Sequence, residues 1–394
     1  NVTVWDLLVG QPRAAEALKA AAEAGRRIAA GDSPGNNAAL AHAWLVTGPP
    51  GSGRTVAARA LGAALQCTGE IVGCGECHGC RSSMAGNNAD VQTISTDLVQ
   101  FKKEQVHGWV SAAYSHPSGG RWRVMIIEDA DRVQERTANV LLKAIEEPPE
   151  RTIWVLCAPT AEEVLPTIRS RSRSLALRTP PAADVAQYIA DQDGASLEDA
   201  LQAAQLAQSH VGLARALLRD PDLRQRRRVM LDLFLSADSV SSAVLVADEV
   251  LDEAKKRTDE RVSHVNAKEK KDFAESLGLS STERIPKAFE SRLKALEEDQ
   301  TRRSKRALTD TLDQALVDLL GFYRDVVALQ HGATTDLVHV DLQEKTRLYA
   351  THLSRDQVLA KITAVEKARR RLQTNANPLL VIEAMNLELV APGS

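Results

Sequence analysis

The sequence predicts an α/β domain with a parallel sheet and an inserted metal knuckle, followed by regions that are entirely helical. Three observations carry this prediction. Short apolar segments alternate with helical patterns in the first third of the chain, which is typical of βαβ units. A glycine-rich loop at 48–55 directly follows the first apolar segment. Four cysteines then occur within the fourteen residues 67–80.

The expected elements follow one another in a simple order. Helices are predicted at 13–30 and 56–65, separated by a polar loop at 31–37 and the phosphate-loop region. Buried strands are predicted at 43–46, 91–94, 123–127 and 153–157. Pro180 and Pro181 mark the best domain boundary, and only helical patterns follow them.

This order predicts three domains. An α/β domain is expected at 1–179, with the knuckle at 67–80, followed by a small helical domain at 180–222 and a larger one at 223–394. Within the last domain, the segment 252–306 is dense in charged residues and is expected to form a long helical hairpin exposed to solvent.

Composition excludes several classes of protein. The chain has 394 residues, a net charge of -3 and a pI near 6.4, which argues against a free-standing nucleic-acid binder. It lacks an apolar run of the length that a membrane span requires, and residues 1–10 do not read as a secretory signal. We therefore expect a cytoplasmic protein, in which clustered cysteines indicate metal binding and not disulfides.

The glycine-rich loop is a candidate nucleotide site. It consists of Gly48, Pro49, Pro50, Gly51, Ser52, Gly53, Arg54 and Thr55. Its placement between a strand and a helix suits a phosphate loop, in which backbone N–H groups hold phosphates and a Ser/Thr hydroxyl binds magnesium. Arg54 stands where a lysine is usual and preserves charge but not geometry. We expect nucleotide binding with doubtful hydrolysis; the alternative is a plain glycine-rich turn.

Two acids, Glu128 and Asp129, follow the predicted strand at 123–127. Carboxylates at this position hold magnesium and orient the attacking water in related folds, in the order Asp then Glu. The order here is reversed, which moves each carboxylate by about one carbon–carbon bond, more than catalytic sites tolerate. The alternative is a solvated strand end without a catalytic role.

The four cysteines Cys67, Cys74, Cys77 and Cys80 have the spacing C-x6-C-x2-C-x2-C. Four thiolates complete a tetrahedral zinc shell, which predicts a structural site with no position open to substrate. His78 could compete as a ligand. The alternatives are a redox pair of Cys77 and Cys80, or inert core cysteines. Cys157 stands apart on an apolar segment and is expected to be a buried small side chain.

Three arginines alternate in the run Arg169-Ser170-Arg171-Ser172-Arg173. An exposed arginine can stabilise the phosphoryl group that is transferred at a neighbouring subunit's nucleotide. The alternative is a set of surface ion pairs, each worth little. Composition alone favours the surface ion pairs.

These residues together resemble the clamp-loader branch of the AAA+ ATPases, over most of the first 220 residues. The segments that carry the resemblance are Val9-Gly10-Gln11, the strand 42–46, the cysteine run, the N-V-L-L-K-A-I-E-E-P-P segment at 139–149, Ser170-Arg171-Ser172 and Gly212-Leu213-Ala214-Arg215. Within this family the altered loop and acids, with the segment 319–326, resemble the delta-prime group of bacterial DNA polymerase III subunits.

The resemblance implies a RecA-like AAA+ domain with a zinc knuckle, a helical lid and a helical collar that assembles a pentamer. It implies that Arg171 is an arginine finger acting in trans and that Arg215 is a second sensor in the lid. The implied cofactors are structural zinc and ATP or ADP with magnesium. The implied partners are gamma/tau and delta subunits, a sliding clamp and primed DNA, in DNA replication.

Two rival functions stay open at this point. The chain could be a gamma/tau-like ATPase that uses Arg54, Thr55, Glu128 and Asp129 itself. It could also be a zinc-stabilised DNA-binding repair factor, although no concentrated basic stripe supports this.

Overall fold

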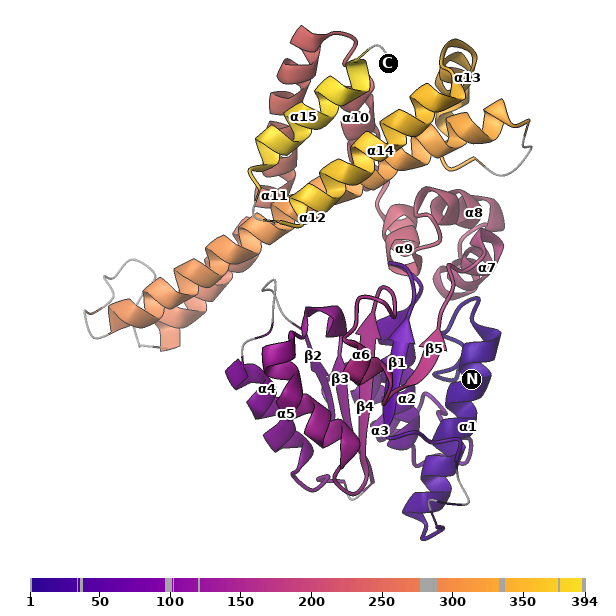
Figure 1. The fold of residues 1–394 in the computed structure, drawn as a ribbon, viewed down its shortest axis with the longest axis vertical. Helices are drawn as coiled ribbons and strands as arrows, with labels where there is room; N and C mark the ends of the chain where they lie inside the picture. The colour runs from indigo at the N-terminus through magenta and orange to yellow at the C-terminus, as the bar shows by residue number, and fades with distance from the viewer. Residues whose placement is uncertain are drawn as a thin grey trace. The chain divides into compact units, whose positions relative to one another are not determined.

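The computed structural model describes residues 2–33, 35, 38–95, 101, 103–119, 121–276, 286, 289–332, 337–374 and 376–391. The chain divides into two compact units, Asn1–Arg215 and Ala216–Ser394 (Figure 1). The first unit contains both the α/β domain and most of the small helical domain, so a boundary at 179 stays a prediction. No helix in the described ranges combines the length and apolar character needed to cross a membrane.

The first unit alternates strands and helices before it becomes helical. Its elements are α1 (Pro12–Ala29), β1 (Ala43–Thr47), α2 (Arg54–Leu65), α3 (His78–Met84), β2 (Val91–Ile94), α4 (Lys103–Ala113), β3 (Arg123–Ile127), a 3-10 turn η2 (Ala130–Arg132), α5 (Glu135–Glu146), β4 (Thr152–Ala158), α6 (Pro166–Arg169), β5 (Arg173–Ala176), α7 (Ala182–Asp193), α8 (Leu197–Leu206) and the first half of α9 (Val211–Arg219), which continues into the second unit. The four predicted strands are confirmed.

Sequence reasoning missed β5. This strand pairs with β1 at the edge of the sheet, and three of its four residues are exposed. It therefore lacks the apolar run by which a strand is recognised. The helix predicted at 56–65 begins two residues earlier in the structure, at Arg54. It starts there because the preceding residue, Gly53, adopts the left-handed conformation (φ 90°).

The five strands form one parallel sheet in the order β2-β3-β4-β1-β5. Strand β4 lies between β1 and β3, and Leu156 pairs in register with both Leu45 and Ile127. The carboxyl ends of β1 and β3 therefore meet at one edge, where ligands bind in open α/β sheets. This register brings the glycine-rich loop and the strand-end acids to the same side of the sheet.

Helices cover both faces of this sheet, as Figure 1 shows. Along β4, Ile153, Val155 and Cys157 pack in one apolar cluster with residues of α1 and α2. Trp154 and Leu156 pack in the opposite cluster with residues of α4 and α5. Burial on both faces explains why the strands read as continuous apolar runs.

The second unit is helical throughout its described ranges. Its elements are α10 (Pro221–Phe234), α11 (Val240–Ser276), α12 (Glu290–Gln330), a 3-10 turn η4 (Val340–Leu342), α13 (Gln343–His352), α14 (Arg355–Leu372) and α15 (Pro378–Val390). The segment 319–326 lies in α12, where Leu319, Phe322 and Val326 are fully buried. Two ion pairs, Arg227–Asp318 and Arg369–Asp313, join α12 to α10 and α14.

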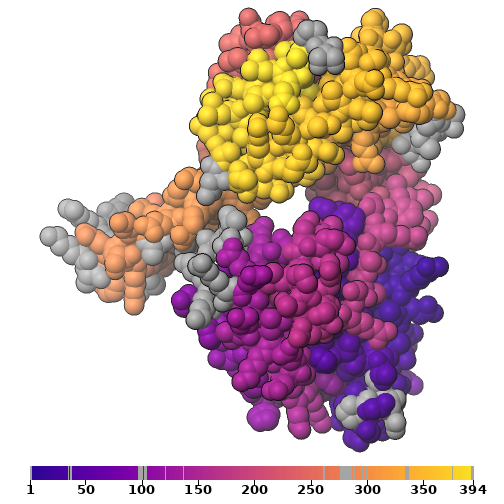
Figure 2. All heavy atoms as spheres, in the orientation of Figure 1, coloured from indigo at the N-terminus to yellow at the C-terminus, as the bar shows by residue number. Residues whose placement is uncertain are grey.

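The predicted hairpin at 252–306 is confirmed where the structure describes it; residues 277–285 and 287–288 lie outside the described residues. The distal parts of α11 and α12 project from the body of the second unit as a two-helix arm (Figures 1 and 2). Two ion pairs, Lys270–Glu297 (3.0 Å) and Arg303–Glu269 (2.9 Å), cross between its helices. Such exposed pairs add little stability, so the buried side chains of the arm hold it together.

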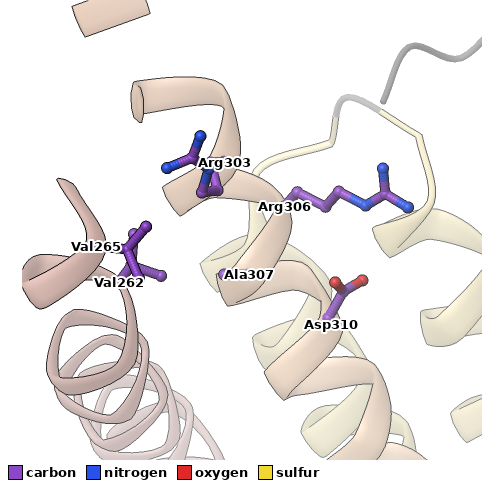
Figure 3. A pocket seen from close by; sticks show the side chains of 6 residues that line it. All are labelled: Val262, Val265, Arg303, Arg306, Ala307 and Asp310. Carbon is purple, nitrogen blue, oxygen red and sulfur yellow. The ribbon is translucent and has the colours of Figure 1, made fainter. Parts of the chain in front are cut away.

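A cavity of about 290 Å³ lies on this arm between its two helices. It is lined by Val262, Val265, Arg303, Arg306, Ala307 and Asp310. In Figure 3 the valines of α11 point toward α12, while the Arg306 side chain extends away from them. Val265 is 47% exposed, so the apolar contact between the helices is incomplete here.

Phe322→Ala is expected to lower the free energy of unfolding of the second unit by about 3–5 kcal/mol, because a cavity replaces a fully buried ring. Urea titration followed by circular dichroism would measure this. Val265→Ala, at a half-exposed position, is the control and should change stability by less than about 0.5 kcal/mol. Equal effects of the two changes would contradict the assigned core.

Candidate functional site

The glycine-rich loop joins β1 to α2 at the carboxyl edge of the sheet. Gly51 and Gly53 have positive φ angles of 83° and 90°, which side-chain-bearing residues rarely adopt. The loop ends at the first turn of α2, whose N–H groups and dipole favour an anion. The Ser52 hydroxyl is buried and finds no hydrogen-bond partner within the described structure. These features are those expected of a phosphate-binding loop, and nucleotide binding by this loop stays a prediction.

Arg54 folds back onto this loop. Its Nη1 donates a hydrogen bond to the Gly48 carbonyl, six residues earlier. Thr55, the predicted magnesium ligand, follows in the first turn of α2 and is partly exposed. The Arg54 guanidinium thus lies at the loop, and one of its N–H donors is already hydrogen-bonded to the backbone.

The strand-end acids lie beside arginines of the same chain. Glu128 follows β3, and its Oε1 is 3.7 Å from Nη2 of Arg59 on α2. Asp129 Oδ1 is 4.0 Å from Nε of Arg132. Burial raises the pKa of the neighbouring Asp131, and the Asp129 carboxylate raises it further. Sequence reasoning missed Arg59, because nothing in its position on α2 signals a partner on β3.

This arrangement does not fit a magnesium ion held by Glu128 and Asp129. Magnesium needs oxygen ligands at about 2.0–2.1 Å in near-octahedral geometry, with carboxylates available to neutralise it. Here each of the two carboxylates has a guanidinium within 4.0 Å. The predicted magnesium role of these acids therefore finds no support in their surroundings.

His210 covers the outer side of the loop. A Cβ added to Gly51 would lie 3.1 Å from the His210 ring, so a larger residue would require this ring to shift and would be strained at φ 83°. The ring Nδ1 accepts a hydrogen bond from Leu213 N (3.2 Å) at the start of α9, and burial lowers the pKa of His210. Sequence reasoning missed this residue as well, although it lies two positions before the predicted second-sensor segment.

The predicted second sensor, Arg215, has its guanidinium in a two-bond pair with the Asp193 carboxylate, at 2.8 and 2.9 Å. This hydrogen bonding raises the pKa of Arg215. The pair joins α9 to the end of α7. A contact between Arg215 and nucleotide stays a prediction.

The four cysteines meet in one cluster. Their Sγ atoms all lie within 4.8 Å of one another, with 3.7 Å from Cys67 to Cys74 and 3.9 Å from Cys67 to Cys77. A tetrahedral ion with Zn–S bonds of about 2.3 Å sets sulfurs about 3.8 Å apart. Cys77 N and Cys80 N each donate to the sulfur three residues earlier, at 3.4 Å. The donor set therefore fits a structural zinc ion.

The environment of the cluster favours thiolates at two of its cysteines. Burial acts to raise the pKa of Cys77, but hydrogen bonds from Thr68 and Cys80 lower it to about 5. Burial is likewise outweighed at Cys67, whose pKa is lowered by backbone hydrogen bonds. Burial raises the pKa of Cys80. Because thiolates are the form that binds metal, an incoming ion would displace the remaining proton.

Two arginines hold the backbone of the knuckle from outside. Arg26 donates to the carbonyls of Gly69 and Glu70 (2.8 Å each), and Arg121 donates to the carbonyl of Cys67 (3.0 Å). Their charges offset the net negative charge that four thiolates and a divalent ion leave. Cys157 is separate from this cluster on β4, where burial raises its pKa to about 12, as expected for an inert core cysteine.

Comparison with known proteins shows which protein family this chain is similar to. A profile described as "DNA polymerase III, delta subunit" matches residues 33–181, and one described as "DNA polymerase III, delta subunit, C terminal" matches residues 287–390. The chain is 24% identical over 353 residues to the DNA polymerase III subunit delta' of Bacillus subtilis, covering 89% of this chain and 91% of that protein. The chain belongs to the delta-prime branch of the clamp-loader AAA+ family.

Other members of the wider family match in part. The gamma/tau subunit of Mycobacterium tuberculosis H37Rv is 32% identical over 206 residues, which are 49% of this chain. The chain spans about a third (32%) of that relative's length. A gamma subunit-related protein from Thermotoga maritima aligns over 89% of this chain and 99% of its own, with 16% identity and a TM-score of 0.35.

The residues that the family resemblance singled out have identifiable contacts. Gln11 donates to the carbonyl of Ser52 (3.2 Å), which connects the N-terminal segment to the phosphate loop. Arg171 pairs with Glu146, the last residue of α5 and part of the family segment 139–149. Arg171 also donates to the Thr167 carbonyl (2.9 Å) and remains 39% exposed. In the isolated chain it therefore makes a surface ion pair, and its action in trans stays a prediction.

Cys77→Ser is expected to reduce the metal content of the purified chain and to lower its thermal midpoint. A structural site of this kind supplies on the order of 10 kcal/mol to local folding. Elemental analysis and thermal unfolding would measure both effects. Cys157→Ala is the matched control and should retain the metal, since Cys157 lies outside the cluster. Unchanged metal content in Cys77→Ser would show that the site is misassigned.

Proposed function

We propose that this chain is the delta-prime subunit of a DNA polymerase III clamp loader and acts as a stator in DNA replication. One observation carries the proposal: the similarity to a delta-prime subunit extends over 89% of the chain and includes the helical second unit. The altered catalytic positions, Arg54 and the Glu128-Asp129 pair, support a role without efficient hydrolysis. The proposed partners are gamma/tau and delta subunits, a sliding clamp and primed DNA.

The proposed mechanism is positional. Arg171 leaves Glu146 and reaches the γ-phosphate at a neighbouring gamma/tau subunit, where it stabilises the charge of the transferring phosphoryl group. Until then Arg171 is paired on the surface with Glu146, the last residue of α5. The proposed lid at 180–222 and collar at 223–394 hold this surface against the neighbour. Zinc at the four cysteines stiffens the segment after α2 and has no catalytic part.

A second candidate is a gamma/tau-like ATPase. The 32% identity to a gamma/tau subunit over 206 residues favours it, because the match covers 49% of this chain. In this case Arg54 and Thr55 serve the chain's own nucleotide. Arg54 hydrogen-bonds the Gly48 carbonyl, which weakens this candidate.

Arg171→Ala is expected to abolish the ATP turnover that this chain confers on a mixture with gamma/tau, delta, clamp and primed DNA. An arginine supplied in trans contributes roughly 10³–10⁵ in rate at the site it serves. A coupled phosphate-release assay would measure the loss.

The control for this experiment is Glu146→Gln, which removes the ion-pair partner but leaves the Arg171 guanidinium in place. Turnover by the mixture should persist in this variant. Persistence of turnover in Arg171→Ala would contradict the finger assignment, whereas rapid turnover by the isolated wild-type chain would favour the ATPase candidate.

Arg54→Lys separates the two candidates. Under the stator proposal the isolated variant remains inactive, because the strand-end acids are still paired with Arg59 and Arg132. Under the ATPase candidate the lysine reaches the β- and γ-phosphates and turnover rises. Phosphate release by the isolated chain, measured with magnesium and ATP, distinguishes these outcomes. Assembly with gamma/tau serves as the check that the variant is folded.

A further inference from the structure

The acids beside the phosphate loop are matched by positive groups of the same chain. Arg59 projects from α2 toward Glu128 at 3.7 Å, and Arg132 lies 4.0 Å from Asp129. The Nε of Arg59 is buried and has no hydrogen-bond partner in the described part of the chain. The ion pair with Glu128 is therefore the polar contact that the structure gives the Arg59 guanidinium.

The loop nonetheless keeps the features that receive an anion. Gly51 and Gly53 retain the backbone shape of a phosphate loop, and α2 presents its amino end there. Ser52 is 3% exposed, and its hydroxyl has no hydrogen-bond partner among the described groups. Arg54 adds a guanidinium that contacts the loop at Gly48. An incoming phosphate would satisfy these donors.

We propose that Arg59 takes the place of the divalent cation beside Glu128, so that this loop binds a nucleoside diphosphate without magnesium. This inference rests on the proposed function in one respect: that function identifies the bound anion as a nucleotide. It makes Arg59 a specificity-determining residue for the cofactor and not a catalytic one.

Charge and space both support this assignment. A magnesium ion bonded to the near oxygen of Glu128 would lie about 2.1 Å from that oxygen. The Arg59 nitrogen is only 3.7 Å from the same oxygen, so the two cations would compete for one side of the carboxylate. Arg54 and Arg132 contribute further positive charge around Asp131. A divalent ion would have to displace Arg59 first.

The test is ADP binding by isothermal titration calorimetry, with excess magnesium and then with EDTA. Because magnesium in solution binds ADP, excess magnesium is expected to weaken ADP binding by the wild-type chain, whose site takes the metal-free nucleotide. Arg59→Met preserves most of the side-chain volume but removes the charge, and it should make magnesium tighten ADP binding by about tenfold or more. Arg13→Met, on the exposed side of α1, is the matched control and should behave as the wild type.

A second probe is Mn²⁺ binding, followed by electron paramagnetic resonance in the presence of ADP. The wild type should bind no Mn²⁺ beyond the amount that ADP binds in a protein-free control, and Arg59→Met should bind more than this control. Magnesium-dependent ADP binding by the wild type would overturn the inference and leave the stator function untouched. Absence of ADP binding in both buffers would overturn it too, while Arg171-dependent turnover by the mixture would decide the stator function separately.

Discussion

The parallel register of β1, β4 and β3 is the constraint on which the rest of the first unit depends. Because Leu156 pairs with both Leu45 and Ile127, the ends of the two outer strands lie at one edge. The phosphate loop and the acids Glu128 and Asp129 are therefore neighbours, although they are far apart in sequence. The apolar clusters on both faces fix this register, since a one-residue slip would turn every core side chain to the other face.

At this edge the strand-end acids make ion pairs with arginines of the same chain. In an active phosphate-loop enzyme the carboxylates face a metal ion and the loop lysine faces phosphate. Here Arg59 faces Glu128, and Arg54 bonds to the Gly48 carbonyl. The exposed Arg171, two residues past the end of α6, lies at the surface with Glu146 as its partner. This distribution of arginines suits a subunit that supplies charge to a neighbour and does not hydrolyse nucleotide itself.

The sequence predicted much of the site because its signals were local. The glycines of the loop, the cysteine spacing and the apolar strand runs each depend on residues close together in the chain. What it did not predict depends on distant contacts. Strand β5 has exposed side chains and exists through its pairing with β1, and Arg26 and Arg121 meet only at the knuckle. His210 likewise reaches Gly51 only through the packing of the helices that follow the sheet.

The sequence by itself determined the α/β fold class, four of the five strands and the four cysteines of the candidate zinc site. Periodicity and spacing encode these features directly. Only the tertiary structure decided which guanidinium each acid meets, that Arg215 pairs with Asp193, and that Arg171 pairs with Glu146. The physical reason is that an ion pair depends on the distance between charges in space, and that distance is set by the packing of helices against the sheet.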